Sequence, residues 1–98
     1  MKTLLLATAI LLSANVSAST YEQCKGVTTV AESVMKARQS GASLDQVMEV
    51  VIAQGMESDV TPLVMLAYDV PRYSTESYRS GAINDFKSKI LKVCMEIK

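Results

Sequence analysis

The chain has 98 residues, with ten basic and ten acidic side chains and neither histidine nor tryptophan. The charges are interleaved and form no basic block, which argues against nucleic-acid binding, because phosphate recognition needs several converging Lys or Arg side chains. The same balance disfavours a cationic membrane-active peptide. Without histidine, the commonest general base and metal ligand is missing. We therefore expect no enzyme, no metal site and no cofactor.

The first eighteen residues have the three parts of a secretory signal peptide. Lys2 supplies one positive charge, residues 4–12 are apolar or small, and a small-residue cleavage motif ends at Ala18. We therefore predict that residues 1–18 are a signal peptide, removed by cleavage between Ala18 and Ser19.

Two alternatives to a signal peptide are a membrane anchor and a core helix. A bilayer core needs about 20 apolar residues, roughly twice the uninterrupted run here, and Asn15 follows that run. A core helix would show a polar, solvent-facing side, which the run lacks. The mature chain, residues 19–98, keeps nine basic and ten acidic side chains and has no second apolar span. We expect one small domain without stable membrane insertion, periplasmic or secreted.

The two cysteines, Cys24 and Cys94, lie near the two ends of the mature chain. An exported protein meets an oxidising environment, and a domain of this size buries only a modest core, so we predict a structural disulfide. In a chain-entropy model, closing a loop of this length contributes about 4 kcal/mol. The alternatives are a zinc site, which two thiols without histidine would complete poorly, and a redox pair, which would need a C-x-x-C motif.

The apolar periodicity is helical almost throughout the mature chain, and no segment alternates like a half-buried strand. A first helix is predicted over residues 21–39, with Gly41 as its stop. Its apolar stripe contains Cys24, Val27, Val30, Ala31, Val34, Met35 and Arg38. A second helix is predicted to follow Ser43, where Gln46 completes a capping box and Gly55 is the terminator.

A third helix is predicted to begin near Asp59, with Pro62 in its first turn and Pro71 beyond its end. Because it is apolar nearly all round, we expect it to be the central, most enclosed helix. A fourth helix is predicted from Ser74, its N-cap, to the end of the chain, and Gly81 within it suggests a close helix crossing. Its stripe contains Tyr78, Ala82, Ile83, Phe86, Ile90, Val93, Cys94 and Ile97. The predicted fold is all-α, a small bundle of about four helices whose first and last are tied by the disulfide.

The segment most typical of a binding site is the connection between the third and fourth helices, where Tyr68, Arg72, Tyr73 and Tyr78 gather. Tyr and Arg dominate binding hot spots, and loops on rigid scaffolds are common recognition sites. These four residues are the candidate partner-binding residues, with Arg72 and Tyr73 as the principal anchors. The alternative is structural. Tyr68 and Tyr78 would pack at the edge of the core with their hydroxyls in water, and Arg72 would pair with Asp69 or cap a helix.

Acidic residues and methionines give weaker signals. Glu57 and Asp59 lie close together at a helix start and could share a cation or flank a substrate, but the more ordinary role is to cap and solvate that turn. The methionines are spread over the four predicted helices and are more typical of core packing than of an adaptable binding face.

Two motifs resemble those of a group of small uncharacterised exported proteins from bacteria and their phages or prophages. One is the Tyr-x-x-Pro-Arg-Tyr turn from Tyr68 to Tyr73, and the other is the stretch from Ala82 to Phe86 ahead of Cys94. The layout of signal peptide and two cysteines is also similar. The resemblance implies a connection with phages and no catalytic residues.

We expect the protein to act by binding another macromolecule, a protein partner, through the 68–78 turn. One version is a phage-related inhibitor or exclusion role, in which it blocks an envelope enzyme or a competing phage. The alternative is a periplasmic stress chaperone, which without histidine would have to be switched by carboxylates at low pH. A small hydrolase is a third possibility and would need carboxylates clustered in a pocket. The sequence predicts no particular oligomeric state.

Overall fold

The computed structural model describes the backbone of residues 2–97 and the side chains of residues 20–97. Within this part of the chain all regular secondary structure is helical. In chain order the helices are α1 (Lys2–Ser40), α2 (Leu44–Ala53), α3 (Glu57–Tyr68) and α4 (Glu76–Ile97). The predicted all-α fold of four helices is confirmed.

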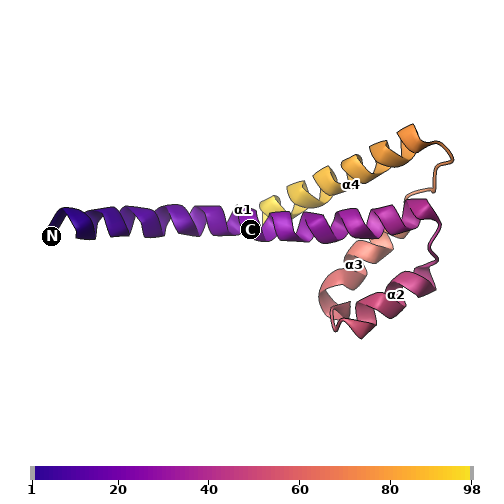
Figure 1. Ribbon diagram of the computed structural model, residues 1–98, viewed down its shortest axis with the longest axis horizontal. Coiled ribbons are helices and arrows are strands. Elements are labelled where there is room, and N and C mark those ends of the chain that lie inside the picture. The colour runs from indigo at the N-terminus through magenta and orange to yellow at the C-terminus, as the bar shows by residue number, and fades with distance from the viewer. Residues whose placement is uncertain (1, 98) are drawn as a thin grey trace.

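α1 is the helix around which the other three are arranged. It packs against α4 on one side and against the α2–α3 pair on the other, and α4 runs back antiparallel to it (Figure 1). The prediction that the third helix is the central one is wrong. α3 packs mainly on α1 and α2, and its side chains Met65 and Leu66 remain exposed.

The core is one cluster of apolar side chains to which all four helices contribute. Full burial of a Val, Ile, Met or Phe side chain contributes roughly 1.5–3 kcal/mol, so this cluster is the main source of stability. Its buried members are Ala31, Val34, Met35, Val51, Val60, Val64, Ala67, Phe86 and Ile90. The predicted stripe of α1 thus faces the core along its central part, whereas Val27 is exposed.

The predicted disulfide is confirmed and joins α1 to α4. The sulfurs of Cys24 and Cys94 are bonded at 2.08 Å, and the Cα atoms are 5.8 Å apart. Cys24 is fully buried and Cys94 is partly buried. Such a bond is compatible with an oxidising compartment. Among the described residues, no helix combines the length and the apolar character that crossing a membrane requires.

The first helix begins much earlier than predicted. Instead of starting near Tyr21, α1 starts at Lys2. No proline lies before Pro62 to interrupt it, and the helix continues through Gly26. The cleavage site predicted after Ala18 lies outside the residues whose side chains are described, and it stays a prediction.

The two turns that flank α2 have the features that the sequence predicts. The backbone N–H of Gln46 donates a hydrogen bond to the Ser43 hydroxyl oxygen (3.2 Å). The backbone N–H of Ser43 donates to the side-chain oxygen of Gln46 (2.8 Å), which completes the capping box. Gly41 and Gly55 have φ angles of +97° and +69°. This left-handed conformation is the usual way for glycine to end a helix, so both predicted stops are confirmed.

α3 begins two residues before the predicted start. Its first residue is Glu57, so Pro62 lies inside the helix and not in its first turn. A proline there leaves the carbonyl four residues earlier, that of Ser58, without its helical donor. Ser58 is exposed, where water can take the place of that donor.

The start of α4 also differs from the prediction. The helix begins at Glu76, and the Thr75 hydroxyl accepts a hydrogen bond from the Tyr78 amide (3.4 Å), so Thr75 and not Ser74 is the cap. No helix crosses closely at Gly81, where a Cβ would meet no atom within 4 Å. Only the middle of the predicted stripe is fully buried, while its ends, including Tyr78 and Ile97, are exposed.

Candidate binding surface

The connection between α3 and α4 lies beside the C-terminal end of α1 (Figure 1). Tyr68 is the last residue of α3, Arg72 and Tyr73 belong to the connection, and Tyr78 is in the first turn of α4. The fold therefore brings all four candidate residues to one end of the molecule, but it uses them in two different ways.

Gln39 fixes the backbone of this connection. Its side chain, only 2% exposed, donates from Nε2 to the Pro71 carbonyl (2.9 Å) and accepts at Oε1 from the Tyr73 amide (2.9 Å). Both ends of one buried amide thus bind the turn, and the side chain stands on the rigid α1. Backbone groups held in this way have little freedom to rearrange.

Two arginines bind carbonyl groups around the same turn. Arg38 donates from Nε to the Val70 carbonyl (3.0 Å), and its guanidinium lies 5.0 Å from the centre of the Tyr68 ring. Arg72 donates from Nε to the Gln39 carbonyl (3.0 Å). Because that carbonyl belongs to the last turn of α1, Arg72 caps the helix, as the structural alternative proposed. The pairing of Arg72 with Asp69 is not formed.

Tyr68 is a structural residue. Its hydroxyl donates to the Ala42 carbonyl (2.7 Å), which ties the end of α3 to the turn between α1 and α2. Partial burial raises the pKa of the Tyr68 hydroxyl, and the nearby Arg38 charge opposes this shift in part. The hydroxyl is therefore a stable donor at neutral pH.

Tyr73 and Tyr78 form the exposed part of the candidate site. Their ring centres are 5.9 Å apart with the planes tilted by 36°, and the side chains are 37% and 68% exposed. Arg79 donates from Nε to the Tyr73 carbonyl (2.7 Å), which joins the turn to α4. We call Tyr73, Tyr78 and Arg79 the tyrosine surface. The expectation that Tyr78 packs at the core edge is wrong, since the residue is largely exposed and the buried side chains of α4 are Phe86 and Ile90.

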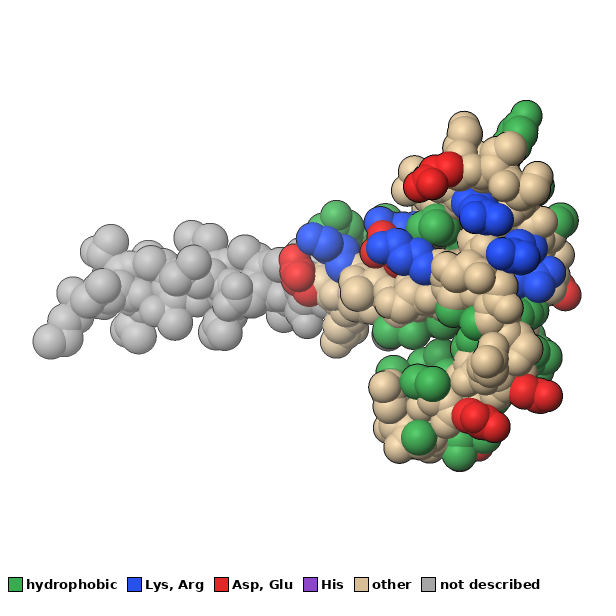
Figure 2. Space-filling view, turned by 45° about the vertical axis from the view of Figure 1, so that its right-hand side comes forward, with side chains coloured by type: hydrophobic (Ala, Val, Ile, Leu, Met, Phe, Trp, Pro, Cys, Tyr) green, Lys and Arg blue, Asp and Glu red, His purple; other side chains and the backbone are tan. Residues whose placement is uncertain are grey.

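Charged side chains lie beside this surface. Lys36, Arg79 and Glu76 border one shallow hollow between α1 and α4, and Figure 2 shows Lys and Arg side chains along these two helices. The tyrosine surface therefore combines aromatic rings with the positive charge of Arg79.

Three of the residues that build the site, Gln39, Arg38 and Arg79, were not among the predicted site residues. One signal was present for Gln39, which lies four residues after Met35 and so falls on the apolar stripe of the first helix. A polar residue on a buried stripe needs a hydrogen-bond partner. No comparable pattern marks Arg79.

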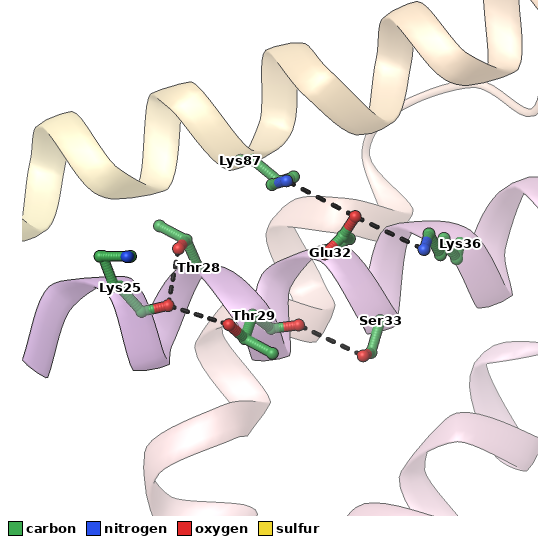
Figure 3. A network of polar contacts seen from close by, with 7 residues as sticks. All are labelled: Lys25, Thr28, Thr29, Glu32, Ser33, Lys36 and Lys87. Carbon is green, nitrogen blue, oxygen red and sulfur yellow. Dashed lines mark hydrogen bonds and ion pairs between the residues drawn. The ribbon is translucent and has the colours of Figure 1, made fainter. Parts of the chain in front are cut away.

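A second polar contact joins α1 to α4 along their length. The Glu32 carboxylate lies 3.4 Å from the Lys36 ammonium, one turn along α1, and 3.5 Å from that of Lys87 on α4 (Figure 3). The ammonium charges, that of Lys36 first and then that of Lys87, hold the pKa of Glu32 below its ordinary value.

The two carboxylates considered for a shared cation, those of Glu57 and Asp59, lie at the start of α3. Glu57 and Asp59 are exposed in the first turn of α3, where the helix dipole favours negative charge. Over the described residues, no group of three or more potential ligands could hold a metal ion. Comparison of the chain with protein-family models, with curated proteins and with solved structures finds no match. The resemblance to exported phage and bacterial proteins accordingly stays a prediction.

Proposed function

We propose that this protein is exported and acts by binding another protein, in the periplasm or outside the cell, through the tyrosine surface. The observation that carries the proposal is the exposure of Tyr73 and Tyr78 as an aromatic pair on a turn fixed by Gln39. Tyrosine supplies a large contact area at low cost in side-chain entropy, and a fixed backbone lowers the cost of binding further.

The roles of the four candidate residues now differ. Tyr73 and Tyr78 are the contact residues of the proposed surface, whereas Tyr68 and Arg72 hold the scaffold through hydrogen bonds to Ala42 and Gln39. Arg79 adds positive charge beside the rings. A partner with acidic and apolar groups would complement this surface.

The test is a pull-down from envelope extract with the oxidised protein, compared with a Tyr78→Ala variant. Tyr78 is 68% exposed, so its removal should leave the fold intact. The matched control is Tyr21→Ala, because Tyr21 is a 46% exposed tyrosine on α1, near the disulfide and far from the turn along that helix. The proposal expects a specific band that disappears with Tyr78→Ala and persists with Tyr21→Ala. The same band in all three samples would overturn it.

A blocking role against an envelope enzyme or a competing phage is one form of this proposal. It would be tested with the captured partner, by measuring whether the protein inhibits the activity of that partner and whether Tyr78→Ala relieves the inhibition.

A periplasmic stress chaperone is the second candidate, and one observation favours it. Apolar side chains remain exposed on α2 and α3, among them Ile52, Met65 and Leu66. Carboxylates would have to trigger the release of more apolar surface, which requires about pH 2 to 3. The measurement is suppression of client aggregation at that pH, together with binding of a hydrophobic dye. A protein that protects no client there is not an acid chaperone.

A further inference from the structure

An elongated hollow lies between α1 and α2, away from the tyrosine surface. Its volume is about 560 Å³, and it is lined from Thr29 to Ala37 along α1 and from Gln46 to Gln54 along α2, with Val60 of α3 adjoining. Eight residues of helix rise about 12 Å, so the hollow is a groove of roughly that length. Figure 2 shows hydrophobic side chains in the angle between α1 and the α2–α3 pair.

The lining of this groove is apolar and carries no charge. None of the lining residues is acidic or basic. The hydroxyl of Thr29 donates to the Lys25 carbonyl (3.1 Å) and that of Ser33 to the Thr29 carbonyl (3.2 Å), both within α1 (Figure 3). The Gln46 side chain is bonded in the capping box with Ser43. These three polar side chains are bonded within their own segments. Gln54, an exposed residue at the end of α2, is the fourth polar residue of the lining, and the groove offers a ligand mainly hydrocarbon.

This composition selects the class of ligand. A charged molecule would lose its hydration in the groove and find no oppositely charged side chain in the lining, whereas an aliphatic chain would gain by leaving water.

We propose that the groove between α1 and α2 binds the aliphatic chain of a single free fatty acid, whose carboxylate stays in water at the open side. This proposal does not depend on the tyrosine surface.

Val50 and Ile52 supply a matched pair of test positions. Both are on α2 and about equally exposed, at 55% and 51%, but only Val50 lines the groove. A glutamate at position 50 would place a charge at the mouth of the groove, and a glutamate at position 52 would not. Neither substitution removes a buried side chain, so both variants should fold.

The experiment is a titration of the oxidised protein, purified after expression of the full chain, with laurate below its micelle concentration. NMR shifts of the valine methyl groups report where laurate binds. The proposal expects saturable binding with shifts at Val34, Val47 and Val51. Val50→Glu should weaken the affinity by about tenfold or more, and Ile52→Glu should change it by less than about twofold. Absence of saturable binding, or equal affinities in the two variants, would overturn the proposal.

A second variant separates loss of the groove from loss of the fold. Ala37→Leu adds an apolar side chain to the groove, so it should weaken laurate binding while thermal stability stays the same or rises. Full laurate affinity in this variant would count against the groove as the site.

Other occupants give different results with the same variants. A concentration-dependent dimer of the free protein that Val50→Glu abolishes would place a second copy in the groove. Val50-dependent binding to phosphatidylcholine vesicles without binding of free laurate would place a bilayer there. Val50-dependent capture of a protein would place a protein there. Each of these results would overturn the fatty-acid proposal.

Discussion

At the scale of single residues, Gln39 shows what the sequence indicates and what it leaves open. Its spacing from Met35 places it on the core-facing stripe, and in the structure it is buried. Its partners, the Pro71 carbonyl and the Tyr73 amide, are 32 and 34 residues away. No local pattern connects positions so far apart, so the partner of a buried polar residue could not be predicted.

Replacing Gln39 with leucine should lower the free energy of unfolding by about 2 kcal/mol. The apolar side chain would leave the Pro71 carbonyl and the Tyr73 amide without their partner, and an unsatisfied buried group costs about 1–3 kcal/mol. Urea unfolding measures the change, with Gln23→Leu, at an exposed position of α1, as the control. Equal stability of the two variants would mean that water replaces Gln39 without cost.

Tyr68 and Tyr78 also have different roles, which the sequence did not distinguish. Both Tyr68 and Tyr78 were considered as residues at the edge of the core. In the structure, Tyr68 donates a hydrogen bond to Ala42, whereas Tyr78 is the more exposed of the two proposed contact tyrosines. Periodicity marks the face of a helix on which a residue lies. It does not tell how far along that face the neighbouring helix reaches.

At the scale of helices, the sequence predicted a helix end correctly where the contacts that form that end lie within a few residues. The capping box at Ser43 and the glycine that ends α2 are formed within a few residues, and both were predicted. The start of α3 was displaced although its N-cap residue, Met56, makes no side-chain cap hydrogen bond. The start of α4 was displaced because neighbouring residues compete for the cap. Thr75 stands next to Ser74, and either hydroxyl can accept the bond that α4 needs.

Gly81→Ala should stabilise the protein by about 1 kcal/mol. Gly81 lies inside α4, and a Cβ there would meet no atom within 4 Å, so alanine brings its better helix propensity without a clash. The measurement is the urea midpoint. Gly55→Ala should act in the opposite direction, since Gly55 has a φ of +69° that alanine adopts poorly. A destabilised Gly81→Ala variant would point to a close contact at that position after all.

The Glu32 ion pairs should make stability fall in acid. The pKa of Glu32 in the folded protein is lowered from its ordinary 4.5, so its contribution is present above that pH and is lost as the pH falls through the lowered value. Glu32 is partly exposed, which keeps the effect small.

The midpoint of thermal unfolding is measured as a function of pH for the unsubstituted protein and for the Glu32→Gln variant. The two curves should differ near neutral pH and converge in acid. Glu49→Gln, at an exposed position of α2, should leave the curve unchanged. A constant difference at all pH values would show that the carboxylate charge is not the cause.

At the scale of the whole molecule, α1 separates two layers. α4 covers one side of it and carries the disulfide, while α2 and α3 pack together on the other. α2 packs mainly on α3 and only lightly on α1, and the groove lies between α1 and α2.

Removal of the disulfide should lower the free energy of unfolding by about 4 kcal/mol, because the bond closes a loop across 70 positions. Urea unfolding of a Cys24→Ser/Cys94→Ser variant, beside the oxidised protein, measures the loss. If the variant unfolds at the same urea concentration, α1 and α4 are held together by the core around Phe86 and Ile90 alone.

The sequence by itself determined the helical class, the capping of α2, the core stripe of α1 and the pairing of Cys24 with Cys94. Periodicity and capping act over a few residues, and two cysteines leave one pairing. Only the tertiary structure decided that α1 is central, that Tyr68 and Arg72 are structural while Tyr73 and Tyr78 face the solvent, and that a groove opens beside α2. These features depend on how helices distant in the chain pack together, and packing is set by the fit of many side chains at once.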